Sequence, residues 1–382
     1  GAVLEHHLVA GQRDQGGVGA GLRRHVGHRP HALIGPQVRE VIGELDAVAR
    51  RTARAVDPEA HEVDVPVPVG GHRLAEKRDD DAWLEAAHQG ASARFVPLWR
   101  NLSLLQHTGG EQKAVYLKPG EIEFSPESPP TLLGEDYKRC FFAVPVDGDQ
   151  KDDILAQHPG SAFQDLRLAS VDMDAKHAGV LAYAKALLYW QYRHAFCGIC
   201  GAPNRLKSAG HRFRCSNPGC NRESFPHIDP AIIVLVTHGD ACLLGRNARW
   251  PEKRFSTLAG FVEPGESLED AVAREVFEES HVRLGDIRYV SSQPWPFPSS
   301  AMCGFYAEAV SRDCSTSDEM EQLRWQTAEQ LRLAVEQDIV RVPPPVSIAF
   351  RLIADWYRQQ CGGTLEEVAR NAGSWAPRKG IK

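Results

Sequence analysis

The segment GFVEPGESLEDAVAREVFEESHV, residues 260–282, decides the fold and the chemistry expected of this chain. Its first seven residues contain two glycines and a proline and predict a loop. The apolar residues that follow recur at helical spacing and can pack against a core: Leu268, Ala271, Val272 and Val276. Glu275, Glu278 and Glu279 are three or four residues apart, so the predicted helix places their carboxylates on one face.

Such a carboxylate face needs a compensating charge. Like charges at this spacing destabilise a bare helix by about 0.2–0.5 kcal/mol per pair. A divalent cation reverses that effect, because Mg²⁺ and Mn²⁺ prefer oxygen ligands. A solvated acidic helix is the alternative for a short glutamate cluster taken alone.

The whole segment fits a longer pattern, Gly-x5-Glu-x7-Arg-Glu-apolar-x-Glu-Glu-x-Gly-apolar, with His281 in place of the last glycine. This pattern resembles the Nudix box. The replaced glycine is expected at the helix C-terminus, where a left-handed residue is common. Histidine adopts that conformation at a modest cost, so we expect the site to survive the replacement.

Composition bounds the class of protein. The chain has 382 residues, enough for two or three domains, and 42% of them are hydrophobic. No apolar run is long enough to span a membrane and no signal peptide is evident, which predicts a cytoplasmic protein. A net charge of −6 disfavours a broad nucleic-acid-binding surface. Nine cysteines, four of them in paired spacing, favour a reducing compartment and one metal site over a disulfide scaffold.

Residues 1–80 differ from the rest of the chain. They contain no aromatic residue and no cysteine, so they bury little area with which to offset the entropy of ordering. We expect a disordered extension or a non-native one from a misassigned start; a weakly folded appendage is the alternative. Residues 37–54 form a possible amphipathic helix.

The fold class predicted for the remainder is α+β. An N-terminal α+β domain is expected over residues 81–193, a zinc ribbon over 194–226, a catalytic domain over 227–362 and a tail over 363–382. Strands are predicted at residues 94–99, 113–117, 140–145, 228–236, 242–245 and 255–259, and a helix at 179–193.

Four cysteines predict a zinc site. The pairs Cys197/Cys200 and Cys215/Cys220 can place four thiolates around one tetrahedral Zn²⁺, which leaves no open coordination position and makes the zinc structural. Redox disulfides and chance spacing are the alternatives. The basic residues between the pairs indicate a solvated loop or, less favoured, a nucleic-acid contact: Arg205, Lys207, His211, Arg212 and Arg214.

A second motif points to the substrate. The segment SQPWPFPSS, residues 292–300, follows the box, and VPPPVSIA stands at residues 342–349. Together with the ribbon, these motifs resemble the NADH pyrophosphatase subfamily of Nudix hydrolases, which includes bacterial NAD-capped RNA decapping enzymes. The resemblance covers residues 83–360 and implies a C-terminal α/β/α sandwich with a mixed sheet.

The resemblance also implies a site. It assigns two or three catalytic Mg²⁺ or Mn²⁺ ions to Glu275, Glu279, a downstream glutamate and the main-chain carbonyl of Ala259, with Glu278 nearby. The downstream glutamate is Glu319, with Glu321 as the fallback. It assigns an adenine clamp, built from two subunits of a homodimer, to Phe225 and Phe261. Other nucleotide contacts fall on Gln293, Trp295, Ser300 and Ala349.

The implied reaction is hydrolysis of the NAD(H) pyrophosphate to a nicotinamide mononucleotide and AMP, or removal of an NAD cap from RNA. Glu279 would orient the attacking water or take its proton. Arg274 is expected to hold a box glutamate in position, since a guanidinium pairs well with a carboxylate. Two alternatives are a broader hydrolase of ADP-ribose or dinucleoside polyphosphates, and a nucleic-acid-binding ribbon with an inert Nudix domain.

Overall fold

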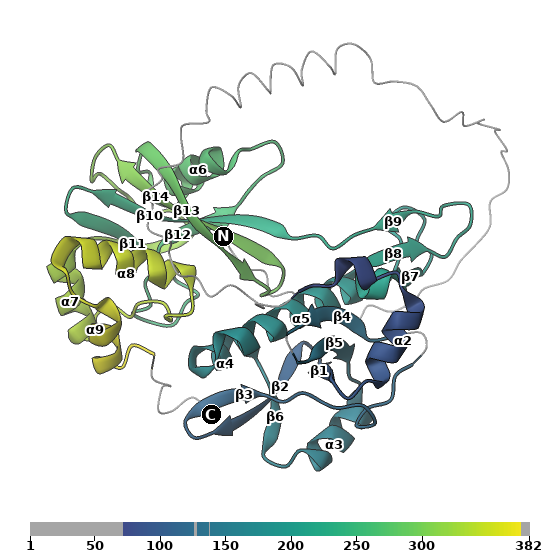
Figure 1. The fold of residues 1–382 in the computed structure, drawn as a ribbon. Coiled ribbons are helices and arrows are strands. Elements are labelled where there is room, and N and C mark those ends of the chain that lie inside the picture. Colours follow the sequence, from purple (N-terminus) through teal and green to yellow (C-terminus); the bar gives the residue numbers. More distant parts are fainter. Residues whose placement is uncertain (1–71, 126–127, 137, 376–382) are drawn as a thin grey trace, which may run out of the picture. The chain divides into compact units, whose positions relative to one another are not determined.

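The computed structural model describes residues 72–375 except 126–127 and 137 (Figure 1). The predicted helix at residues 37–54 and most of the predicted extension lie outside the described residues. Residues 72–80 are ordered: Leu74 is buried in a hydrophobic core and His72 forms a β-bridge with Glu135. The ordered part of the chain therefore includes residues before the predicted boundary at residue 80, and buried Leu74 helps to anchor them.

The first sheet lies within residues 93–164 and is mixed. Its strands run in the order β3-β2-β1-β5-β4, and β6 also pairs with β2. Their bounds are β1 Ala93–Trp99, β2 Leu102–Thr108, β3 Glu111–Ala114, β4 Thr131–Glu135, β5 Cys140–Pro145 and β6 Ser161–Gln164. The strands predicted at 94–99 and 140–145 are confirmed, whereas the strand predicted at 113–117 corresponds to β3, which ends earlier.

Helices cover both faces of this sheet. They are η1 Ala75–Lys77, α2 Asp81–Gln89, α3 Gly148–Gln157, α4 Leu166–Ala169, η2 Ser170–Asp172 and α5 Ala175–Arg193. Alternate residues of β1 enter different cores: Phe95 packs with α2 and α3, and Val96 packs with α5. The helix predicted at 179–193 is confirmed, and it begins earlier because Asp174 caps its N-terminus.

A small three-stranded sheet follows α5. Its strands are β7 Asn204–Lys207, β8 Arg212–Cys215 and β9 Glu223–Ser224, all antiparallel, with the short 3₁₀ turn η3 at Ser208–Gly210. Phe213 of β8 packs on Trp190 of α5 with ring centroids 4.8 Å apart. This contact anchors the ribbon to the helix.

The second sheet is also mixed, with strand order β13-β14-β10-β11-β15, and β12 pairs with β10. The bounds are β10 Asp229–His238, β11 Ala241–Asn247, β12 Leu258–Phe261, β13 Leu284–Trp295, β14 Ser300–Ala309 and β15 Met320–Thr327. The predicted β10–β11 hairpin is confirmed, with His238 opposite Ala241. The strand predicted at 255–259 is found at 258–261 instead. Phe255 is buried as a strand residue would be, but its segment forms only one bridge to β11, at Ser256.

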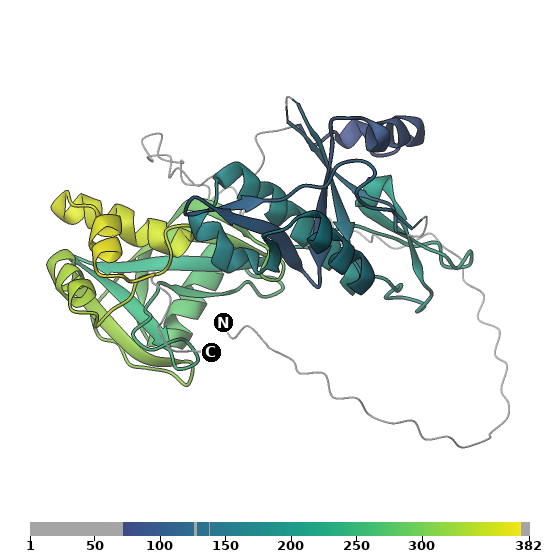
Figure 2. The same ribbon diagram turned by 90° about the horizontal axis from the view of Figure 1, so that it is seen from below.

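Four helices sandwich this sheet: α6 Leu268–Ser280 on one face, and α7 Ala328–Glu336, α8 Ile348–Cys361 and α9 Leu365–Asn371 on the other (Figure 1). Alternate residues of β10 serve the two faces, since Val234 packs with α6 and Leu235 with α8. The yellow α8 and α9 helices lie together at one side of the sheet (Figure 2).

The segment predicted as a tail, residues 363–382, contains helix α9 and is described as far as residue 375. Leu365 and Ala369 of α9 are buried in the same core as α8, and the Trp375 indole donates a 2.9 Å hydrogen bond to the Pro343 carbonyl. None of the helices in the described residues is long and apolar enough to cross a membrane.

Candidate active site

The acidic helix α6 is fixed at both ends. Ser267 caps its N-terminus by accepting a hydrogen bond from the Asp270 amide, and apolar residues bury one face against the sheet. At the C-terminus, His281 is left-handed, with φ 58° and ψ 12°. The prediction that this residue occupies the left-handed position of the box glycine is confirmed. The His281 ring also hydrogen-bonds Ser315, with 2.9 Å between Nδ1 and Oγ.

The Glu275 carboxylate lies against the backbone of β12. A Cβ added to Gly260 would overlap the carboxylate of Glu275. Gly260 pairs with Ile232 in the sheet, so this strand cannot move away from the helix. Sequence reasoning treated Gly260 only as a loop residue, although its place at the start of the box was a signal that a close approach occurs there.

Glu279 is the most buried of the box glutamates, with 2% of its surface exposed. Burial raises the pKa of its carboxyl to about 7, the charge of Glu275 acts in the same direction, and a backbone hydrogen bond from Ala259 opposes the shift. A deeply buried carboxylate beside a second one fits a site for a hard divalent cation. Because Ala259 lies next to Gly260 in β12, the strand brings its backbone to both glutamates.

Arg274 connects three other carboxylates. Its guanidinium makes a bidentate contact with Glu266, at 2.6 and 3.0 Å, and donates to the Phe261 carbonyl at 2.8 Å. One Nη lies 3.0 Å from both Glu275 and Glu278. These contacts hold the loop against the helix, which is the positioning arrangement expected of Arg274.

The downstream glutamates differ in environment. Glu321 forms an ion pair with Arg246, a buried residue of β11. Glu319 is exposed just before β15, and its amide donates to the Ser317 hydroxyl at 3.3 Å. The assignment of the downstream ligand to Glu319, with Glu321 as the fallback, stays a prediction.

The glutamates do not converge on one point. Within residues 72–375, apart from the three that are not described, the four cysteines are the one group of three or more donors close enough to share an ion. Glu275 instead contacts Arg274. The assignment of metals to Glu275, Glu279 and Glu319 therefore stays a prediction.

Gln293 ties the two proline-rich motifs together. Its side-chain nitrogen donates to the Val346 carbonyl at 2.7 Å, and its oxygen accepts from the Ile348 amide at 2.8 Å. Both ends of the amide are thus used within the fold. Sequence reasoning assigned Gln293 to the nucleotide and missed this contact, because it joins residues more than fifty positions apart.

The same loop reaches the N-terminal domain. Phe297 packs against the core under α5, and its ring lies 5.5 Å from the Lys185 ammonium. Trp295 contacts Phe297 edge-on at 5.0 Å and lines a cavity of ≈ 300 Å³ together with Met173, Val346 and Arg351. None of the described lining residues belongs to α6, so this cavity is separate from the acidic face.

The remaining predicted nucleotide contacts are unequal in exposure. Phe225 and Phe261 are 55% and 41% exposed, which is high for aromatic rings. Ser300 and Ala349 are buried, Ala349 among the apolar residues of α8. Burial therefore leaves both residues little surface for contact with a ligand.

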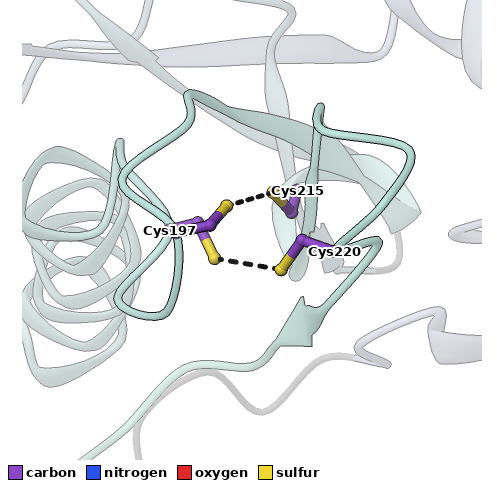
Figure 3. Close-up of side chains that lie close together, drawn as sticks. Cys197, Cys215 and Cys220 are labelled. Carbon is purple, nitrogen blue, oxygen red and sulfur yellow. Dashed lines mark hydrogen bonds between the residues drawn. The ribbon is translucent and has the colours of Figure 1, made fainter. Parts of the chain in front are cut away.

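The four ribbon cysteines do come together. Their sulfur atoms lie within 4.8 Å of one another; Cys197 and Cys220 are 3.8 Å apart, and Cys200 and Cys215 are 3.4 Å apart (Figure 3). A tetrahedron with Zn–S bonds of about 2.3 Å has edges of about 3.8 Å, so the cluster fits zinc. All four cysteines are free thiols rather than disulfides.

Comparisons with known proteins agree with this geometry. A family model described as the NUDIX domain matches residues 227–344, and one described as an NADH pyrophosphatase-like rudimentary NUDIX domain matches residues 92–190. NAD-capped RNA hydrolase NUDT12 of Pongo abelii is 33% identical over 331 residues, covering 75% of this chain and 71% of that protein. The chain belongs to the Nudix hydrolase family. The resemblance to its NADH pyrophosphatase subfamily is confirmed.

Two other Nudix relatives show how much of the chain is shared. Human NAD-capped RNA hydrolase NUDT12 is 39% identical over 237 residues, 59% of this chain and 51% of that protein. NAD-capped RNA hydrolase NudC of Stutzerimonas stutzeri is 40% identical over 202 residues, 52% of this chain and 72% of that protein. The chain thus spans about half the length of the human relative. The strands of the first sheet lie within residues 92–190, which match the rudimentary NUDIX domain model.

Proposed function

We propose that this Nudix hydrolase cleaves the pyrophosphate bond of NAD(H) into a nicotinamide mononucleotide and AMP, and removes NAD caps from RNA 5′ ends. The observation that carries the proposal is the pair Glu275 and Glu279 of α6, one held against Gly260 and the other almost fully buried. The names of the relatives, NAD-capped RNA hydrolases, support the substrate.

Two or three Mg²⁺ or Mn²⁺ ions bound by Glu275, Glu279, Glu319 and the Ala259 carbonyl would supply positive charge to the pyrophosphate and help to activate water. Glu279 orients the attacking water or accepts its proton. Glu278 lies near these metal-binding groups, since it contacts the same Nη of Arg274 as Glu275 does. Arg274 is a positioning residue.

We further propose that the protein is a homodimer in the cytoplasm. Phe225 and Phe261 are exposed, and a partner subunit would let two such rings enclose one adenine. Gln293, Trp295, Ser300 and Ala349 would line the remainder of the nucleotide site. The ribbon binds one structural Zn²⁺, and free cysteines suit a reducing compartment.

The test compares product formation from NADH and Mn²⁺ by wild type and Glu279→Gln. Wild type is expected to release AMP and the reduced mononucleotide, and the variant to lose about 10²-fold or more in rate. Glu269→Gln is the matched control, because Glu269 is exposed on the first turn of the same helix.

Two results would count against the proposal. Cleavage of ADP-ribose without turnover of NADH would favour the broader hydrolase. No hydrolysis of either substrate would favour a binding protein with an inert Nudix domain.

A further inference from the structure

The zinc ribbon has one strongly cationic face. In the β7–β8 pair, Arg205 lies directly opposite Arg214 and Lys207 directly opposite Arg212. Directly opposite side chains in an antiparallel pair project from the same face of the sheet. Four cations therefore share one face, while the opposite face carries Phe213, which is buried.

This cationic face is only partly compensated. Glu223, in β9, is 3.2 Å from Arg212, and Asp79 is 3.6 Å from the same guanidinium. Arg214 donates to the neutral side chain of Asn221. Among the described residues, Arg205 and Lys207 have no ion pair within 4.0 Å. Like charges directly opposite one another destabilise a sheet, so a bound anion would stabilise this face.

The charge is local to the ribbon. Residues 194–226 contain five arginines and lysines and one carboxylate; four thiolates on one Zn²⁺ would contribute −2, so the net charge of the loaded ribbon is +2 in a chain whose total is −6. An acidic protein that concentrates positive charge on one small sheet attracts a polyanion to that sheet. The negative total therefore does not argue against binding at this place.

The ribbon is also tethered near the acidic site. Ser224 ends β9, and seven residues later Ala231 pairs with Phe261 in the sheet that carries the box. Seven extended residues span at most about 25 Å. The exposed ring of Phe225 lies on this connection.

We propose that the cationic face, formed by Arg205, Lys207, Arg212 and Arg214, binds the phosphates of single-stranded RNA that follows an NAD cap. The inference rests on the proposed function and specifies its substrate class. A free dinucleotide has no phosphates beyond its pyrophosphate, so this face favours capped RNA over free NAD(H). RNA fits better than an acidic protein segment, because the capped substrate of the proposed function carries a chain of phosphates directly after its cap.

The first test is binding, which does not depend on catalysis. The double variant Arg205→Gln/Lys207→Gln removes two exposed cations, and Lys118→Gln/Lys138→Gln removes two exposed cations from the first domain as a control. Fluorescence anisotropy with a labelled single-stranded RNA carrying a 5′-monophosphate gives the Kd at 50 and 200 mM salt.

The expected signature is a change in salt dependence. Each single-strand phosphate contact contributes about 0.7 to the slope of log Kd against log salt, so losing two reduces the slope by about 1.4. Between 50 and 200 mM salt, the Kd of wild type and control should rise about sevenfold more than that of the double variant. Identical slopes for all three proteins, or no RNA binding by wild type, would overturn the proposal.

Hydrolysis separates this inference from the proposed function. The double variant should cleave NADH at the wild-type rate and lose kcat/KM only on NAD-capped RNA. An equal loss on both substrates would show a general defect and overturn the role of the face. A wild type that binds RNA with the expected salt slope but cleaves neither substrate would refute the proposed activity alone. Displacement of RNA by polyglutamate as readily as by RNA of equal charge would identify an acidic-peptide site instead.

Discussion

Replacing Gly260 with alanine should separate catalysis from stability. The new Cβ would overlap the Glu275 carboxylate, so that carboxylate must move by on the order of 1 Å or more. Misplacing a catalytic group by about 1 Å can cost about 10²-fold in rate, which corresponds to about 2.7 kcal/mol of transition-state stabilisation. Gly260 has ordinary strand geometry, in which alanine is favoured over glycine by about 0.5–1 kcal/mol. We therefore expect activity to fall while the thermal midpoint hardly changes.

The assay is AMP release from NADH with Mn²⁺, followed beside thermal unfolding of the same preparation. Gly285→Ala is the matched control, since Gly285 is also a strand glycine and the nearest atom to its added Cβ is 3.7 Å away. It should leave both quantities unchanged. Wild-type kcat/KM in Gly260→Ala would refute the reasoning, because it would show that the position of Glu275 against β12 does not matter for the reaction.

Three further predictions concern stability. His211→Gln should make the stability of the fold less dependent on pH. Burial lowers the His211 pKa to about 4, so the stabilising contribution of this residue is complete above about pH 6.5 and is lost as pH falls toward 4. Between pH 7 and pH 5, the free energy of unfolding measured with urea should fall by about 2 kcal/mol less in the variant than in wild type. Equal decreases in the two proteins would contradict this. Gln293→Ala should lower the free energy of unfolding by about 1–3 kcal/mol, because it removes partners from the Val346 carbonyl and the Ile348 amide; an unchanged urea midpoint would show that water replaces them. Chelation should remove one zinc ion per chain and lower the thermal midpoint. The Cys220→Ala variant should already lack the metal without added chelator. Full zinc content in that variant would contradict the ligand assignment.

The elements that sequence periodicity located are those with long apolar stripes. Helix α6 repeats apolar residues at helical spacing, α5 is long and rich in apolar residues, and β10 contains an unbroken apolar run, so local pattern and tertiary packing agree. The predicted elements differ from the structure where a buried residue lies in a segment without a regular apolar pattern. Leu74 orders a polar segment, and buried Phe255 imitates a strand residue in a loop. Neither effect is visible in a local pattern, because each depends on what lies across the core.

The candidate site also combines features that could be predicted from the sequence with features that could not. Helical spacing predicted the shared face of Glu275 and Glu279, and left-handed preference predicted His281. The contact between Glu275 and Gly260 could not be predicted, since it depends on the register of β12 against β10. The use of both ends of the Gln293 amide is likewise a long-range result, and it assigns a structural contact to a residue whose motif suggested only ligand binding.

The charges of the box explain how the fold holds this acidic cluster. Arg274 contacts Glu266, Glu275 and Glu278, and such a cation offsets the repulsion that three carboxylates would otherwise cause. Glu279 differs, because burial and the charge of Glu275 raise its pKa and so disfavour its ionised form. Without a bound cation, the chain therefore holds one carboxylate where its charge lowers stability, while Arg274 partly compensates the charge of the others. A buried ionisable group whose charge lowers stability is typical of functional sites, and here it is the glutamate to which the proposed reaction assigns the proton.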